Sequence, residues 1–337
     1  MQFIEQILTF FGGGARVWPP RRLSLALQGG GSFGAFTAGA LDRLLDEADV
    51  DFDAVSGASA GAVNAVLLAS GLIEGRAAAK ARLERFWKRM SQSAAFLPKA
   101  SFASLMGVAP FLHSLSPYQF NPFNLDPLRD ALAAEIDFAE LRAKSPMKLL
   151  IGATRVRDGK LRIFGASELT VESVLASACL PLIHHTVEIA GEPYWDGGYV
   201  ANPPLIPLLQ ASDAAHLLIV QVTPTASDRL PKTPREIVRR LERIQFNATL
   251  AAELEAVKLG IILRATPKLR RLRIGRISAQ DEFAGLENES PADLGGEFLD
   301  RLWQSGRGAV ETWLEQAGPQ GRREGRSRGE GWLGGAA

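Results

Sequence analysis

Short apolar runs alternate with longer amphipathic stretches over the first quarter of the chain. Residues 23–28 (LSLALQ) and 52–56 (FDAVS) have the apolar character of buried strands. Each is followed by glycines and then by a stretch with helical apolar spacing, at 35–47 and at 62–70. Strand, glycine-containing turn and helix, repeated twice, are typical of a layered α/β fold.

The same reading extends over the rest of the chain. Two strand-like runs flank Asp158-Gly159, a dipeptide that signals a hairpin. Residues 91–124 are rich in Phe and Leu but broken by prolines, and they supply either core packing or the wall of an apolar substrate groove. Further elements are expected as helices at 77–90, 171–181, 234–263 and 297–316 and as strands at 148–157, 160–166 and 216–222.

These elements divide the chain into four parts. Residues 1–22 are an N-terminal segment that forms an amphipathic helix if the apolar residues between Phe3 and Phe11 share one face. Residues 23–210 carry the repeated α/β units, and we expect them to form a three-layer α/β/α sandwich with a central, mostly parallel sheet. Residues 211–317 add a strand and helices packed on that domain, and the Gly/Arg-rich tail, 318–337, is expected to be disordered.

Composition and charge narrow the classes of function. The chain is 46% hydrophobic and 22% charged, and its net charge of +1 gives no indication of nucleic-acid binding. From residue 231 to 276, however, twelve Lys or Arg stand against four Asp or Glu, a balance of +8. This segment is either a surface for an anionic membrane or a solvated face with carboxylate partners in the same chain.

Other features bear on location. The single cysteine, Cys179, is compatible with a reducing compartment, so a cytoplasmic protein that is peripheral to the membrane is expected. There is no run of about 18 uncharged apolar residues, and no transmembrane helix is expected.

Gly29-Gly30-Gly31-Ser32-Phe33-Gly34 matches G-x-G-x-x-G between a strand and a helix. One use of such a loop is dinucleotide binding, with Asp53 about 20 residues on as the ribose ligand. Asp53 falls at the start of the second strand rather than at its end, which disfavours that use. The other use is to present backbone N–H groups to an anion, either a phosphate or the oxyanion of acyl transfer.

Ser59 lies between Gly57 and Gly61 in the stretch GASAG, with a strand before it and a helix after it. This is the pattern of a nucleophile elbow, in which a sharp strand-to-helix turn exposes a serine hydroxyl. The alternative is a tight turn whose hydroxyl is satisfied locally.

A serine nucleophile needs a base. None of the four histidines occupies a motif position, which favours structural roles for them: His113, His184, His185 and His216. Asp196 is the better candidate, because Gly197 and Gly198 let the chain turn and leave its carboxylate facing a site. The alternative is an Asp-Gly turn in a surface loop.

In this order, the glycine loop, the serine motif and the Asp-Gly-Gly motif resemble the patatin-like phospholipase family. The resemblance covers about 23–210, including flanking segments at 176–181 and 202–204, and residues 234–257 look like an extension of bacterial members. It implies a lipid acyl hydrolase with a Ser–Asp dyad, with Ser59 as nucleophile and Asp196 as base, and it implies neither metal nor cofactor. The oxyanion hole that it implies consists of Gly29, Gly30, Gly31 and Gly34.

One position departs from the family. The loop usually carries Arg or Lys just before its last glycine, and here that position is Phe33. The backbone donors survive this change, whereas any help from a cation is lost.

The expected function is therefore hydrolysis of lipid esters, as by a phospholipase A or a lysophospholipase, through an acyl-serine intermediate. Burial beside Tyr194 and Trp195 is expected to raise the pKa of Asp196 enough for it to act as a base. The alternatives are an acyltransferase or thioesterase that recruits a histidine, and a lipid-binding protein that does not use Ser59.

Overall fold

The computed structural model of the protein describes residues 19–96, 115–227, 229–263 and 266–317. Within them the strands form one eight-stranded sheet in the order β5-β6-β3-β2-β1-β7-β8, with β4 paired to β3. The strands are β1 (Arg22–Leu27), β2 (Asp51–Gly57), β3 (Lys148–Arg155), β4 (Leu161–Gly165), β5 (Val187–Ile189), β6 (Glu192–Asp196), β7 (His216–Gln221) and β8 (Arg273–Ser278).

The sheet is mostly parallel. Strands β3, β2, β1, β7 and β8 run in one direction, and β4, β5 and β6 form the antiparallel pairings. The expected hairpin is β3–β4, and Gly159 in its turn has a φ of +66°. This positive φ explains the glycine at that position.

Helices cover both faces of the sheet. On β1, Leu25 and Leu27 face one apolar core, whereas Ala26 between them faces a second core. The α-helices are α2 (Gly34–Leu44), α3 (Ala60–Glu74), α4 (Arg76–Phe96), α6 (Pro117–Phe120), α7 (Pro127–Glu135), α8 (Phe138–Lys144), α9 (Val171–Ser177), α10 (Leu205–Ala211), α11 (Pro234–Ile262), α12 (Pro267–Arg271), α13 (Ala279–Glu282) and α14 (Gly296–Ala317).

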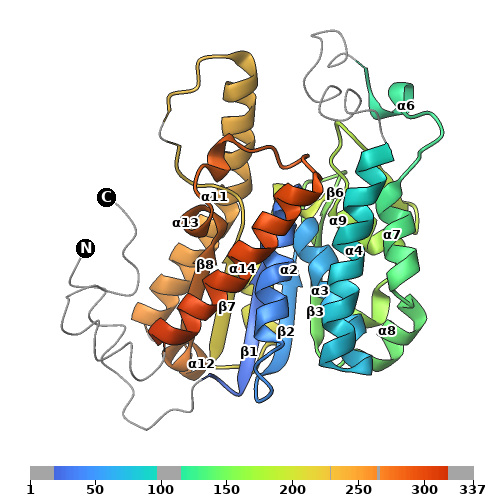
Figure 1. The fold of residues 1–337 in the computed structure, drawn as a ribbon. Helices are drawn as coiled ribbons and strands as arrows, with labels where there is room; N and C mark the ends of the chain where they lie inside the picture. The colour runs from blue at the N-terminus through green and yellow to red at the C-terminus, as the bar shows by residue number, and fades with distance from the viewer. Residues whose placement is uncertain (1–18, 97–114, 228, 264–265, 318–337) are drawn as a thin grey trace.

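The first core lies under α2, α3, α4 and α14, which cover the near side of the sheet in Figure 1. The second lies under α10 and α11 on the other face. These two apolar layers on either side of one sheet confirm the three-layer α/β/α fold.

One strand of the sheet, β8, and one hairpin pairing, β5 with β6, were not expected from the sequence. Strand β8 begins within the basic segment 231–276, so Arg273 and Arg276 belong to a strand of the sheet. The β5–β6 hairpin turns through Ala190 and Gly191, both at positive φ. Strands β7 and β8 extend the sheet beyond β1, and the boundary expected at residue 210 falls inside α10, so strands on both sides of it belong to one continuous sheet.

Some expectations fall outside this description. The apolar residues from Phe3 to Phe11, the tail 318–337 and most of the apolar segment 91–124 lie outside the described residues. In the part of the chain that the structure describes, no helix combines the length and apolarity needed to cross a bilayer.

Helices α2 and α14 pack with their backbones in close contact. A Cβ at Gly306 of α14 would lie 2.0 Å from the carbonyl oxygen of Phe36, and one at Gly39 of α2 would lie 2.0 Å from that of Trp303. Glycine at both positions therefore sets the distance between these two helices.

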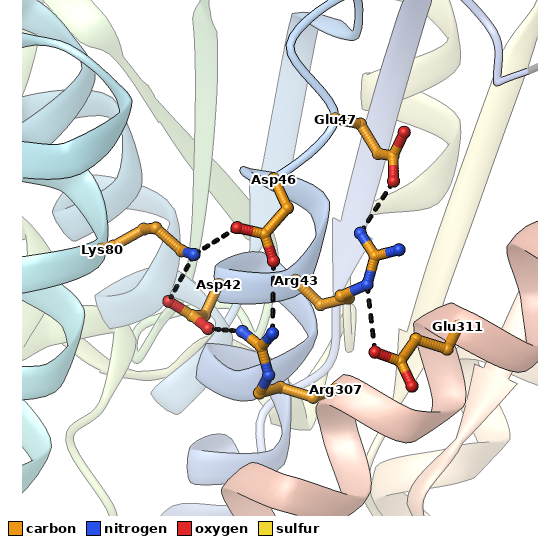
Figure 2. Close-up of polar contacts among 7 residues, drawn as sticks. All are labelled: Asp42, Arg43, Asp46, Glu47, Lys80, Arg307 and Glu311. Carbon is orange, nitrogen blue, oxygen red and sulfur yellow. Dashed lines mark hydrogen bonds and ion pairs between the residues drawn. The ribbon is translucent and has the colours of Figure 1, made fainter.

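Ion pairs flank this contact, as Figure 2 shows. Arg307 of α14 pairs with Asp42 and Asp46 of α2, and Lys80 of α4 pairs with the same two carboxylates. Because most of these groups are partly exposed, each pair contributes at most about 1 kcal/mol to stability. Close packing is thus the larger constraint on the position of α14.

We predict that Gly306→Ala lowers the free energy of unfolding by about 1–3 kcal/mol, because the added methyl group forces two helix backbones apart. Gly308→Ala is the matched control on the same helix, since a Cβ there meets nothing within 4 Å. It should be neutral or stabilise by up to about 1 kcal/mol through helix propensity. Urea unfolding measures both, and equal effects of the two substitutions would contradict the close contact.

Candidate functional site

Ser59 occupies a strained turn between β2 and α3. Its φ of 54° and ψ of −129° are unusual for a residue other than glycine. Its N–H donates to the carbonyl oxygen and the hydroxyl of Ser177, which holds the turn. The Ser59 hydroxyl does not cap α3, although Ser59 is the N-cap residue. Strain of this kind typically costs about 1–3 kcal/mol and marks functional turns.

The glycines on either side of Ser59 are explained by close approach. A Cβ at Gly57 would lie 2.5 Å from the carbonyl oxygen of Gly61, and one at Gly61 would lie 2.0 Å from that of Leu27. The first turn of α3 therefore packs directly against the ends of β1 and β2.

Asp196 reaches the same place through the pairing of β3. Gly57 at the end of β2 pairs with Ile151, and Asp196 at the end of β6 pairs with Ala153 two residues further on. Because β4 pairs with β3 across both stretches, β2 and β6 must follow one another along the opposite edge of β3. This register brings the carboxylate to the turn that holds Ser59.

The carboxyl group of Asp196 is fully buried. Burial raises its pKa to about 7, against lowering contributions from the N–H of Gly198 and the hydroxyl of Ser59. Oδ1 accepts a hydrogen bond of 2.7 Å from Gly198, whereas Oδ2 has no partner with full hydrogen-bond geometry among the described residues. The Ser59 hydroxyl is thus near enough to affect the carboxyl group, in a contact looser than a regular hydrogen bond, as is common before substrate binds.

The glycine loop packs against the serine. A Cβ at Gly29 would lie 2.6 Å from Cβ of Ser59. The four loop glycines do not have equivalent N–H groups, however. Gly29 donates to Oδ1 of Asn202 at 2.7 Å, and Gly34 donates within the short helix η1 (Gly31–Phe33). These two bonds leave Gly29 and Gly34 with structural roles.

Gly30 and Gly31 differ, because neither N–H donates a hydrogen bond within the described part of the chain. Gly31 has a φ of +58°, and a Cβ there would lie 2.3 Å from the carbonyl oxygen of Pro291. The loop therefore needs glycine at this position, and its open donors come from Gly30 and Gly31.

Phe33 is buried, with its ring edge-to-face with Phe298 at a centroid distance of 6.2 Å. The position where the family has a cation is thus part of the apolar contact between the loop and α14. The aromatic residue at this position is explained by its packing against α14.

Sequence reasoning missed the side chains that hold the loop. Asn202 accepts from the N–H of Gly29 and donates to its carbonyl oxygen, and Thr223 donates to the same oxygen. Gln28 accepts from the N–H groups of Val222 and Thr223 at 2.9 and 2.8 Å. In the sequence, Asn202 is distinguished only as part of a flanking segment that resembles the family.

The hydrogen bonds of His184 and His185 go to groups other than Ser59 and Asp196. Nδ1 of His184 accepts from the N–H of Leu180, and His185 contacts the carbonyl oxygen of Pro117. His216 begins β7, so it lies at the amino-terminal ends of the parallel strands, whereas Ser59 lies at their carboxyl-terminal ends. His113 lies outside the described residues.

Two other candidate groups have structural settings. Burial raises the pKa of Cys179 to about 12, so its thiol is a poor nucleophile. Asp53 pairs with Arg22 and accepts from the hydroxyl of Ser212 and the N–H of Asp213. These contacts lie near the start of β2, whereas the glycine loop follows the end of β1. Asp53 is therefore not placed to bind a ribose beside that loop. Among the described residues no group of three or more His, Cys, Asp or Glu side chains could hold a metal ion.

Comparisons with known proteins identify the family. The family model described as patatin-like phospholipase matches residues 25–209, more than half of the chain. Similar solved structures include VipD from Legionella pneumophila, at 16% identity and a TM-score of 0.39 over 84% of this chain and 66% of that one. They also include the ExoU–SpcU complex from Pseudomonas aeruginosa, at 20% identity and a TM-score of 0.33 over 70% and 51%.

The chain spans about two thirds or less of the length of these solved chains. No curated protein matches it in a sequence search.

We predict that Asp196→Asn gains stability relative to the wild type as pH rises. Between the ordinary carboxyl pKa of about 4 and the folded value of about 7, the folded protein keeps a proton that the unfolded chain has lost. Wild-type stability therefore falls through this window, and the substituted protein is spared that fall. The difference in free energy of unfolding between Asp196→Asn and the wild type should change by about 2–3 kcal/mol between pH 5 and pH 8, as measured by urea unfolding.

Asp53→Asn is the control for this measurement. Burial acts to raise the pKa of Asp53, but the hydrogen bonds from Asp213 and Ser212 and the charge of Arg22 outweigh it and lower the value. Both folded and unfolded states are then ionised across pH 5–8, so the effect of this substitution should stay constant. A constant effect of Asp196→Asn as well would rule out the raised pKa.

Proposed function

Because this chain belongs to the patatin-like phospholipase family, we propose that it hydrolyses ester bonds of lipids, with Ser59 as nucleophile and Asp196 as base. One observation carries the proposal. Ser59 occupies a strained turn, and its hydroxyl does not cap α3. It lies beside the fully buried carboxyl group of Asp196, and burial raises the pKa of that group to about 7. This pairing matches a nucleophile with a base suited to neutral pH.

The first half of the reaction forms an acyl-enzyme. Asp196 takes the hydroxyl proton of Ser59 as the oxygen attacks the ester carbonyl carbon. The tetrahedral intermediate then collapses, and Asp196 returns the proton to the departing alcohol. The fatty acyl group remains bound to Ser59 as an ester.

The second half restores the enzyme. Asp196 removes a proton from a water molecule, which attacks the acyl-serine carbonyl carbon. Collapse of this second intermediate returns the proton to the Ser59 oxygen and releases the fatty acid. Every proton is thus carried by one carboxyl group, which must pass between its two forms at working pH.

The developing oxyanion needs donors that are already in place. The N–H groups of Gly30 and Gly31 are suited to this, since each lacks an acceptor within the described chain. Asn202 acts as a positioning residue, because it fixes both the N–H and the carbonyl group of the preceding Gly29. Gly29 and Gly34 support the loop rather than donate to substrate.

A dyad is favoured over a triad, because the hydrogen bonds of His184 and His185 go to Leu180 and Pro117 and His216 lies at the start of β7, whereas Ser59 follows the end of β2. A histidine-dependent acyltransferase or thioesterase is correspondingly less well supported. We extend the proposal to location: a cytoplasmic enzyme that meets its lipid substrate at a membrane surface.

We predict that Ser59→Ala and Asp196→Asn each lower the rate of lipid ester hydrolysis by at least ~10³-fold, because the pair acts as a unit. Ser93→Ala, on the helix α4, is the control and should keep full activity. A fluorophosphonate should label the wild type and the Ser93→Ala protein but not the Ser59→Ala protein. Near-wild-type turnover by folded Ser59→Ala protein would exclude the proposed nucleophile, and unlabelled wild type would favour a lipid-binding protein.

A second prediction concerns pH. Since the base must be ionised, kcat/KM for a soluble short-chain ester should rise with pH and level off above an apparent pKa of about 7. A profile that is already flat above pH 5 would mean that Asp196 has an ordinary carboxyl pKa or is not the base.

A further inference from the structure

The N-terminal half of α11 carries an apolar stripe that faces solvent. Ile237, Leu241 and Ile244 are spaced at i, i+4 and i+7, so they share one face of the helix. Their exposed fractions are 43%, 60% and 49%, and Val238 beside them is 52% exposed. Leu230, just before the helix, is 79% exposed. Contiguous exposed apolar surface of this kind marks an interaction site.

Basic residues surround the stripe. Residues 229–244 contain six Lys or Arg and two Glu, a balance of +4. Arg239 and Arg240 donate to the carbonyl oxygens of Asn288 and Thr225, and neither forms an ion pair with a carboxylate among the described residues. Their charges therefore remain available to an anionic surface.

The basic segment as a whole does not form this surface. Arg243 is buried and donates to the carbonyl oxygens of Glu287 and Glu289. Arg273 and Arg276 lie on β8. Arg243 is therefore not available to an anionic surface, and the stripe with its neighbouring cations lies on the first half of α11.

The inner face of the same half-helix supports the catalytic site. Phe246 packs on Gly198, where a Cβ would lie 2.6 Å from its ring, and its carbonyl oxygen accepts from Asn202. Asn247 accepts from the side chain of Gln28 at 3.0 Å. Ile244 and Ile237 thus lie two and nine residues before Phe246, or about 3 Å and about 14 Å along the helix axis from a residue that touches the site.

The segment held by Arg243 also reaches the glycine loop. After Glu287 and Glu289, the carbonyl oxygen of Pro291 accepts from the N–H of Ser32 at 2.8 Å. The exposed helix and the proposed oxyanion loop are therefore joined by a short chain of contacts.

Other exposed apolar side chains lie at the same end of the molecule. In Figure 1, the start of α11 and the short helix α6 both stand at the upper end. Phe123 and Leu125, which follow α6, are 85% and 73% exposed. The hydroxyl oxygen of Tyr118 on α6 accepts a hydrogen bond from the N–H of Thr186, which ties this segment to the region of β5.

We propose that the first half of α11, with Ile237, Leu241 and Ile244 inserted and the neighbouring arginines at the headgroups, docks the protein on an anionic bilayer. The inference rests on the proposed function only in that such a bilayer holds the lipid substrate. Charge favours a bilayer over a second copy of the chain, because two-fold contact through this surface would bring like charges together. Docking here presents the catalytic site to the lipid surface.

The test measures binding in the absence of turnover. Ser59→Ala protein is sedimented with vesicles of phosphatidylcholine alone or with phosphatidylglycerol added. We expect binding to the anionic vesicles that weakens with salt, and a loss of roughly tenfold or more when Leu241→Glu is added, because a charge replaces an inserting side chain.

Leu259→Glu is the matched control. Leu259 lies in the second half of the same helix and is 55% exposed, close to the 60% of Leu241. This substitution adds the same charge to the same helix, and it should leave binding within about twofold of the parent. Equal losses from both substitutions would overturn the proposal, since they would reflect net charge alone.

Three other outcomes would also overturn it. They are equal binding to neutral and anionic vesicles, a dimer in solution that Leu241→Glu dissociates, and a lower melting temperature for Leu241→Glu than for Leu259→Glu, which would mean that this chain covers its own stripe. Hydrolysis of a soluble ester by the wild type tests the proposed chemistry separately. A protein that hydrolyses the ester but ignores vesicles would keep the function and lose the docking surface.

Discussion

The fold brings one carboxyl group out of water and next to one serine. That constraint depends on the order of two strands along a single edge of β3, where β2 ends at Gly57 and β6 takes its place at Asp196. A carboxylate without water or a cation is unfavourable, so the proton is retained to a pH near 7. In the proposed mechanism, the same unfavourable burial suits the group to act as a base at neutral pH.

Holding this arrangement costs stability that other parts of the structure must offset. Ser59 sits at positive φ, and Ser177 fixes it through two hydrogen bonds to its N–H. Asn202 and Thr223 fix Gly29 from strands and loops more than 170 residues away in sequence. The two apolar cores on the faces of the sheet supply the rigidity that such a site requires.

The sequence predicted much of this because the chemistry is concentrated in short motifs. Ser59 with its flanking glycines and Asp196 with Gly197 and Gly198 are each readable within about five residues. The helices α11 and α14 were also predicted closely, since long periodic stretches leave little ambiguity. Strand β8 was missed because its two arginines made the stretch resemble a basic surface segment rather than a strand of the sheet.

The remaining features could not be read from local sequence. The pairing of β6 with β3 is a long-range register, and no motif encodes that Asp196 lies two positions beyond Gly57 along the same edge. The N–H of Gly29 is engaged because it donates to Asn202, and nothing in the local sequence distinguishes this asparagine from any other. The burial of Arg243, likewise, depends on carbonyl oxygens that lie more than 40 residues further on.

The central claim is that Asp196 titrates near neutrality because it is buried beside Ser59. Carbon-13 NMR of protein labelled at the aspartate carboxyl carbons measures this directly, with the Asp196 signal assigned by its loss in the Asp196→Asn protein. The account predicts a midpoint near pH 7 that moves higher in the Ser59→Ala protein, since the Ser59 hydroxyl lowers the pKa. A midpoint near pH 4 that Ser59→Ala leaves unchanged would contradict it.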